Sequence, residues 1–128
     1  MIKYIFISAL ILIASCQEST KKSTTESKLP LNESVELKFS GSWVQPNPIN
    51  ENEVQGFTLN EDSSASSINM ATLLYKKWWL KNGKLFLISE SIGNKVSSVD
   101  TTAYEVVNHT DSTLEIKNGN YTDKYVKQ

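Results

Sequence analysis

The segment LLYKKWWLKNGKLFLISESI, residues 73–92, carries the strongest signal for the fold. At its centre Asn82-Gly83 supplies the two positive-φ residues that a type I′ hairpin turn requires. Near this turn both faces of the hairpin are apolar, whereas a half-exposed sheet alternates apolar and polar residues. We therefore expect one face to line an interior and the other to be covered, to bind something or to contact a partner. The expected cross-strand pairs are Leu80 with Leu85, Trp78 with Leu87, Trp79 with Phe86, and Leu73 with Ile92.

Turn signals recur on both sides of this hairpin, and no stretch has convincing helical periodicity. A second Asn-Gly, at Asn118-Gly119, predicts a hairpin with Ile116 opposite Tyr121 and Leu114 opposite Asp123. The stretch 64–81 is too long for one straight strand, so we expect a bend or bulge near Lys76-Lys77, or two strands. The predicted strands are 37–45, 54–60, 64–81, 84–92, 96–107, 112–117 and 120–127.

Sequential antiparallel strands of this number favour a closed arrangement, because closure removes exposed strand edges. The predicted fold class is therefore all-β, an antiparallel up-and-down barrel of seven or eight strands. The turn pattern does not require the barrel to close completely, so an incompletely closed barrel is an alternative expectation.

The amino terminus reads as an export signal. A short basic start is followed by an apolar run over residues 4–13, which is too short to cross a membrane and is typical of a secretory signal peptide. The next residues, Ile13-Ala14-Ser15-Cys16, match the bacterial lipobox, in which the cysteine thiol accepts a diacylglyceryl group. The alternative is an ordinary signal peptide with an incidental cysteine.

These signals divide the chain into three parts. We expect a lipoprotein signal peptide over 1–15, a lipidated Cys16 with a flexible tether over 16–36, and a folded domain over 37–128. The polar composition of residues 17–34 cannot bury enough apolar surface to fold. Gln17 favours delivery to the outer membrane, so the expected first partner is the lipid bilayer, reached through acylated Cys16.

Composition excludes several classes of protein. The chain has 128 residues, 13 of them lysine and none arginine, against 14 acidic residues. A dedicated nucleic-acid binder needs a basic face and usually arginine forks, so nucleic acid is not an expected partner. One cysteine and one histidine exclude a disulfide framework and multi-cysteine zinc sites. We predict no enzymatic activity, no cofactor and no metal; His109, in a polar turn, is expected to be an exposed turn residue.

A family resemblance rests on several short motifs. Gly41-Ser42-Trp43 lies on the first predicted strand, where G-x-W marks lipocalins, and segments 55–59, 65–79 and 91–94 resemble small lipocalin-like lipoproteins of one Gram-negative phylum. The resemblance covers roughly residues 37–126. It implies a short lipocalin-type barrel on a lipid anchor, with Trp43 plugging its closed end and with no established reaction or ligand. The arginine that stacks on this tryptophan in lipocalins is absent, so Lys124 and Lys127 are the candidates to replace it.

Two hypotheses for function follow. In the first, the barrel binds a small apolar or amphipathic ligand; in the second, the barrel is filled and acts as a protein–protein interaction module, an envelope inhibitor or an accessory subunit of a surface complex. Because Trp78 and Trp79 are adjacent on one strand, they point to opposite faces, and only one can face inward. An open cavity of roughly 300 Å³ or more would favour the first hypothesis. The candidate ligand-binding residues, which could equally be core, are Trp43, Tyr75, Trp78, Trp79 and Phe86.

Overall fold

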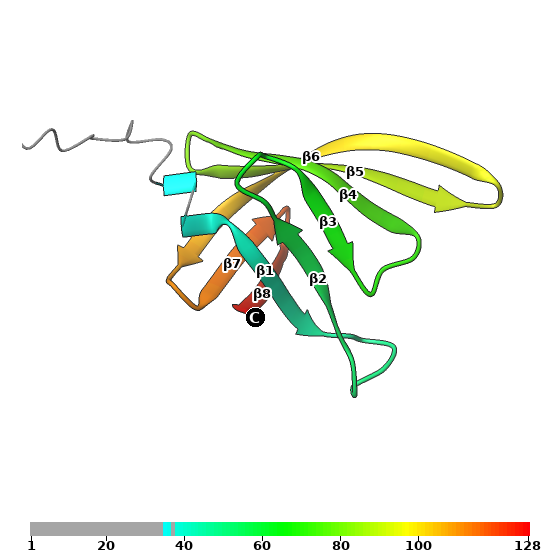
Figure 1. Ribbon diagram of the computed structural model, residues 1–128, viewed down its shortest axis with the longest axis horizontal. Helices are drawn as coiled ribbons and strands as arrows, with labels where there is room; N and C mark the ends of the chain where they lie inside the picture. The colour runs from blue at the N-terminus through cyan, green and yellow to red at the C-terminus, as the bar shows by residue number, and fades with distance from the viewer. Residues whose placement is uncertain (1–34, 37) are drawn as a thin grey trace, which may run out of the picture.

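The computed structural model describes residues 35, 36 and 38–128. The expected signal peptide, Cys16 and the tether up to residue 34 lie outside the described residues. Eight strands follow one another along the chain (Figure 1). They are β1 (Gly41–Pro46), β2 (Val54–Leu59), β3 (Ala65–Ile68), β4 (Leu73–Lys81), β5 (Lys84–Gly93), β6 (Val96–His109), β7 (Thr113–Asn118) and β8 (Tyr121–Lys127).

The strands form one antiparallel sheet in the order β3-β2-β1-β8-β7-β6-β5-β4. Consecutive strands are paired except β3 and β4, and β8 pairs with β1 through Trp43–Lys127 and Val44–Val126. The sheet curls into a nearly closed barrel with one unsealed seam between β3 and β4. This confirms the predicted all-β, up-and-down barrel, with eight strands.

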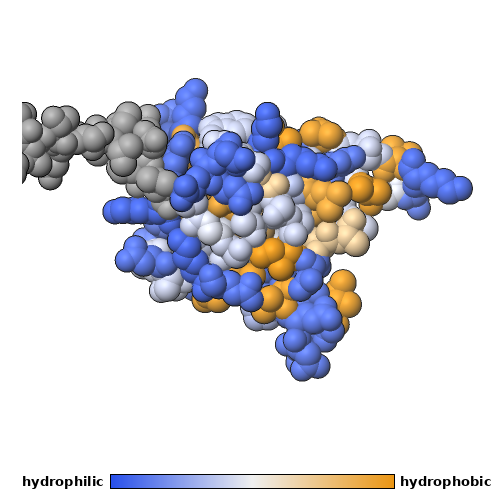
Figure 2. Space-filling model, viewed as in Figure 1, coloured by the Kyte–Doolittle hydropathy of each residue, from blue (hydrophilic) through white to orange (hydrophobic). Residues whose placement is uncertain are grey.

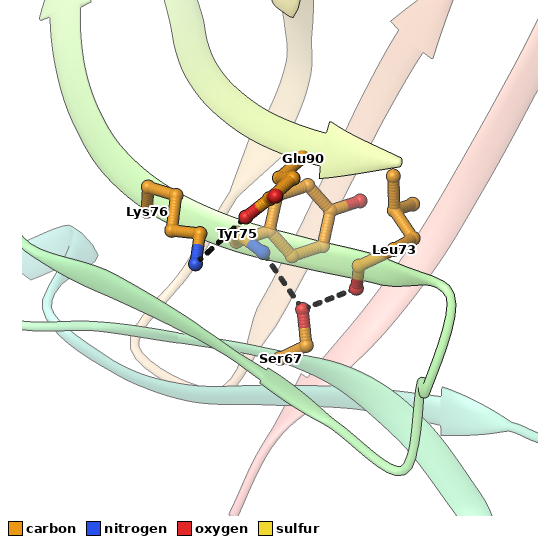
Figure 3. Close-up of polar contacts among 5 residues, drawn as sticks. All are labelled: Ser67, Leu73, Tyr75, Lys76 and Glu90. Atoms are coloured by element: carbon orange, nitrogen blue, oxygen red, sulfur yellow. Dashed lines mark hydrogen bonds and ion pairs between the residues drawn. The ribbon is translucent and has the colours of Figure 1, made fainter. Parts of the chain in front are cut away.

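Side chains and a single bridge hold the seam in place of a continuous ladder. The Ser67 hydroxyl accepts a hydrogen bond from the backbone N–H of Tyr75 at 2.8 Å and donates one to the carbonyl of Leu73 at 2.6 Å (Figure 3). At the other end of β3, Ser64 and Lys77 form an isolated bridge. Two backbone groups on β4 are thus satisfied by one hydroxyl, although β3 is too short to pair with the whole of β4.

The central hairpin has the predicted register near its turn and a shifted register beyond it. Leu80–Leu85, Trp78–Leu87 and Trp79–Phe86 are paired as expected, and Asn82 and Gly83 have φ values of 52° and 71°. Leu73, however, pairs with Ser91 and not with Ile92. The bulge between Tyr75 and Lys77 inserts one extra residue into β4, which displaces the pairing by one position.

The segment 64–81 forms two strands joined by a turn, one of the two expected arrangements. Asn69, just after β3, has a φ of 53°, which ends the extended backbone there. The bulge predicted near Lys76-Lys77 is also present within β4.

The predicted register of the second Asn-Gly hairpin is wrong. Its turn is Gly119-Asn120, so Asn118 pairs with Tyr121 and Ile116 pairs with Asp123. Of these two turn residues only Gly119 has positive φ, 59°, as at the first position of a type II′ turn. The turn therefore lies one residue later than Asn118-Gly119, and the shift puts Leu114 opposite Tyr125.

The first strand begins later than predicted. The backbone is helical at Val35, Glu36, Lys38 and Phe39, and extended only from Gly41. Val35 and Phe39 are separated by four residues, so a helical turn places them on one side. Within the described residues, no helix has the length and apolar character needed to cross a membrane.

Side chains fill the middle of the barrel. Phe57 from β2, Leu85 and Leu87 from β5 and Leu114 and Ile116 from β7 are all at most 1% exposed. A barrel of about eight strands is just wide enough for its own side chains, and this one contains them. The remaining buried members of the same cluster are Phe39, Trp43, Leu59, Ala65, Tyr75, Trp78 and Tyr125.

Candidate ligand-binding groove and the placement of the aromatic residues

Trp43 closes one end of the barrel and is completely buried. Its indole Nε1 donates a hydrogen bond to the carbonyl of Phe39 at 2.7 Å, which ties the helical turn to β1. The Lys127 Nζ lies 5.1 Å from the centroid of the Trp43 ring. Of the two lysines considered for the place of the missing arginine, Lys127 occupies it, while Lys124 pairs with Glu115 at 2.7 Å.

Gly41 makes room for this contact. A Cβ built on Gly41 would lie 2.5 Å from Cε of Lys127, and the residue has a φ of 127°. Both observations favour glycine, because L side chains rarely adopt this backbone conformation. Gly41 therefore allows the Lys127 side chain to lie where it contacts Trp43.

His109 is not an exposed turn residue. It is the last residue of β6 and stacks on Phe39, with ring centroids 3.9 Å apart, while its edge faces Trp43 at 5.8 Å. Its Nε2 is buried and has no hydrogen-bond partner within the described part of the chain. Burial is the main cause that lowers the pKa of His109 below its usual 6.5. The half-buried imidazole contacts two aromatic rings, so His109 has a packing role at this end of the barrel.

Tyr75 and Trp78 face into the barrel from β4. Tyr75 contacts Phe57 edge-on at 5.4 Å, and the Trp78 Nε1 donates to the carbonyl of Asn60 at 2.8 Å. Trp78 is 2% exposed, so it is the inward member of the tryptophan pair.

Trp79 and Phe86 lie on the outer face of the same hairpin. Their rings stack at 5.1 Å with an interplanar angle of 5°. The five residues considered together as a ligand site are therefore divided: Trp43, Tyr75 and Trp78 are in the core, and the stacked pair is outside. The structure does not bring them together around one cavity.

The phenol groups of three tyrosines lie close to one another in the barrel. Burial raises the pKa of Tyr75 and of Tyr125 above 10, and the neighbouring Tyr104 phenol and Asp123 carboxylate raise both further. Burial also raises the pKa of Tyr104. Each phenol is thus held in its protonated form, in which it can donate a hydrogen bond but carries no charge.

A groove of about 470 Å³ opens beside the closed end, between the helical turn and the β4–β5 turn. Its walls are apolar, from Phe39, Leu80 and Val106, while Lys81 and Glu36 supply charge. The groove is larger than the roughly 300 Å³ at which a cavity favours ligand binding. It lies, however, at the rim of a filled barrel and not in its centre. Its lining residues are Val35, Glu36, Phe39, Leu80, Lys81, Asn82, Gly83 and Val106.

None of the five aromatic candidates lines this groove. The available signal was the spacing of Val35 and Phe39, which are four residues apart as on one side of a helix. A single turn is too short to show helical periodicity against a background of strands. The groove also depends on Val106, which is distant in sequence and reaches the β4–β5 turn through a backbone hydrogen bond from its N–H to the carbonyl of Gly83 at 3.2 Å.

The described residues contain no group of three or more histidine, cysteine, aspartate or glutamate side chains able to hold a metal ion. The polar groups that face the groove are a lysine, a glutamate and an asparagine. This arrangement can orient the polar head of a ligand whose body lies on the apolar walls.

Comparison with known proteins gives a consistent result. A family profile described as lipocalin-like matches residues 35–128. A solved structure of a lipocalin-like protein from Bacteroides thetaiotaomicron VPI-5482 is 39% identical, with a TM-score of 0.65, and the match covers 69% of this chain and 94% of that one. No curated protein matches the sequence. The matched residues include every strand of the barrel, and the chain therefore belongs to the lipocalin-like family.

Proposed function

We propose that this protein is a lipid-anchored lipoprotein of the bacterial outer membrane that binds a small apolar or amphipathic ligand in the groove beside the closed end of its barrel. The observation that carries the proposal is the groove itself, about 470 Å³ with Phe39, Leu80 and Val106 as walls. Lipocalin-like barrels commonly bind small hydrophobic ligands, which agrees with this lining.

The polar groups of the groove support an amphipathic ligand. Lys81 and Glu36 line the same groove as the apolar walls, so a polar head beside them leaves the body of the ligand on apolar surface. An apolar body gains roughly 25 cal/mol for each Å² removed from water. No catalytic step is proposed, because the single histidine contacts Phe39 and Trp43 and does not line the groove.

The lipid anchor is a separate part of the proposal and rests on the lipobox ending in Cys16. Metabolic labelling with a fatty-acid analogue tests it directly. The wild-type chain is expected to take up label, and Cys16→Ser is expected to take up none. Labelling of the serine variant would contradict the anchor.

Fluorescent ligand titration tests the groove. Anilinonaphthalene sulfonate, an amphipathic probe, is expected to bind saturably and to be displaced by dodecanoate. Val35→Trp fills the groove and is expected to abolish binding, whereas Val126→Trp, at another exposed valine, on β8, is expected to leave it unchanged. Lys81→Gln is expected to weaken dodecanoate more than dodecanol, which has the same chain and no charge.

The filled barrel is the observation that favours the second function, a protein–protein interaction module. Equal binding of the probe to Val35→Trp and Val126→Trp would contradict ligand binding in the groove. Saturable binding of a sugar without any response to apolar ligands would contradict it as well. If none of the ligands tested binds, the interaction module is the favoured function.

A further inference from the structure

The outer face of β4, β5 and β6 carries an apolar band, in which Trp79, Phe86 and Ile88 are half-buried and Ile92 and Val99 are exposed. The stacked pair Trp79 and Phe86 begins the band near the β4–β5 turn. Because their neighbours Trp78, Leu85 and Leu87 are buried, the alternating residues of these strands point outward. The cross-strand rows of this outer face are Trp79–Phe86–Ala103, Lys77–Ile88–Thr101, Leu74–Glu90–Val99 and Ile92–Ser97.

The band continues along a hairpin that extends beyond the rest of the barrel. β5 and β6 run past the other strands to a turn at Asn94-Lys95 (Figure 1). Ile92 and Val99 are 39% and 65% exposed on the outward rows of this extension. Figure 2 shows hydrophobic surface at the base of the extension and hydrophilic side chains at its tip.

Lysines accompany the band. Lys76 pairs with Glu90 at 3.2 Å, but within the described part of the chain Lys77, Lys81 and Lys84 take part in no ion pair. Glu105, opposite Lys84, is the other acidic residue along these rows, so lysines outnumber carboxylates on this face. The whole chain has a net charge of -1, and the positive face is therefore a local feature.

We propose that this face, defined by Trp79, Phe86, Ile88, Ile92 and Val99 with Lys77 and Lys84, docks the barrel on an anionic lipid bilayer surface. Tryptophan and phenylalanine with flanking lysines are the composition of elements that lie in a membrane interface. The aromatic rings reach the headgroup region, and the ammonium groups meet lipid phosphates. The argument is independent of the groove and of any covalent anchor.

A second copy of the chain fits this face less well. In a symmetric dimer the same patch meets itself, so a surface on which lysines outnumber carboxylates faces a surface with the same excess of positive charge. Like charges across an interface oppose association. An anionic surface satisfies the lysines and the apolar band at once.

Site-directed spin labelling of the full chain tests the proposal. In a Cys16→Ser background, a nitroxide is attached at Thr101→Cys, on the outer row beside Ile88, or at Thr122→Cys, an exposed threonine on β8 away from this face. Accessibility of each label to oxygen and to an aqueous nickel complex is measured on vesicles of phosphatidylglycerol with phosphatidylcholine, and on phosphatidylcholine alone. Every variant keeps residues 1–34, so any vesicle association through that segment is the same in all of them. A difference between the two labels therefore reports contact of this face with the bilayer.

On anionic vesicles the label at 101 is expected to lose nickel accessibility and gain oxygen accessibility, while the label at 122 stays aqueous. Lys77→Glu with Lys84→Glu is expected to abolish the change at 101. Lys38→Glu with Lys124→Glu alters the net charge equally at exposed lysines outside β4, β5 and β6 and is expected to preserve it; Lys81 is left intact because it lines the groove. Unchanged circular dichroism of each variant shows that the barrel is folded.

Three outcomes would overturn the proposal. They are an aqueous label at 101 on anionic vesicles, equal burial at 101 and 122, and burial at 101 that persists on phosphatidylcholine alone or in the Lys77→Glu, Lys84→Glu variant. The first would favour an acidic protein as the partner of this face. None of them bears on ligand binding in the groove, which is measured without vesicles.

Discussion

The Nζ of Lys127 lies 5.1 Å from the centroid of the Trp43 ring, so the last strand of the barrel covers the tryptophan of the first. The same Nζ donates a hydrogen bond to the carbonyl of Lys38 at 3.4 Å, at the helical turn that precedes β1. Lys127 therefore connects β8, β1 and the turn at the closed end of the barrel.

Removing this charge is expected to weaken the closed end. Lys127→Met keeps the aliphatic stem but loses the cation, and we expect it to lower the free energy of unfolding by about 1 kcal/mol. Lys127→Arg is expected to retain wild-type stability, because a guanidinium can also stack on an indole. Urea unfolding measures both. Lys124→Met, at an exposed lysine on the same strand, is the control and is expected to cost less.

Gly56 is expected to tolerate no side chain. A Cβ there would lie 1.9 Å from the carbonyl oxygen of Trp43, a backbone atom on the paired strand that cannot rotate away. We expect Gly56→Ala to lower the free energy of unfolding by about 3 kcal/mol. Gly83→Ala is the matched comparison, since no atom lies within 4 Å of its Cβ and only its φ of 71° opposes alanine, at about 1 kcal/mol. If thermal or urea unfolding gave the same loss of stability for Gly56→Ala and Gly83→Ala, the steric explanation for Gly56 would be contradicted.

The Ser67 hydroxyl is expected to hold the seam closed. Ser67→Ala leaves the Tyr75 N–H and the Leu73 carbonyl without this partner, at an expected cost of about 1–3 kcal/mol. The change is expected to be local, with faster hydrogen exchange at the Tyr75 amide than at Leu87 in the paired ladder. Ser67→Thr retains the hydroxyl and is expected to restore slow exchange. Uniform acceleration at both amides would show that the seam does not open separately.

Stability is expected to fall as pH decreases through the titration of His109. Because burial lowers its pKa in the folded state below 6.5, the unfolded chain binds a proton first. The stabilising difference is complete above pH 6.5, begins to be lost as the pH falls below that value and is fully lost below the folded pKa. His109 is the single histidine, so urea unfolding at pH 5.5 and 7.5 isolates it. His109→Phe is expected to remove this pH step, and a step that persists would assign it to other groups.

Replacing the inward Trp78 is expected to change the free energy of unfolding more than replacing the outward Trp79. Trp78→Ala removes a 2%-exposed core side chain and its hydrogen bond to Asn60, at an expected cost of about 3–5 kcal/mol. Trp79→Ala removes a ring from the outer face and is expected to cost clearly less. Chemical denaturation of the two variants side by side is the measurement, and a larger loss for Trp79→Ala would contradict the assigned orientation.

Much of the barrel follows from the sequence because its signals are local. Asn82-Gly83 can adopt two positive φ values with little strain, so the register next to that turn is determined within a few residues. The adjacent Trp78 and Trp79 must point to opposite faces of a strand. These two facts alone predict the central hairpin and one tryptophan inside the barrel.

Where local signals allow two arrangements equally well, the tertiary structure determines which one forms. Gly119-Asn120 and Asn118-Gly119 are both acceptable turns, and burial of Leu114 and Ile116 against the core accompanies the former. Similarly, Lys124 and Lys127 have the same chemistry, and only the pairing of β8 with β1 places Lys127 over Trp43.

The groove is the feature furthest from the reach of the sequence. It is formed by a single helical turn, the β4–β5 turn and Val106 on β6, which meet only when the sheet has curled. The sequence by itself determined the strands, the first hairpin turn and the alternation of faces, because φ preferences and side-chain alternation act between near neighbours. The choice of inward face, the second turn, the role of Lys127 and the groove required contacts between residues far apart in the chain, whose energies no local pattern encodes.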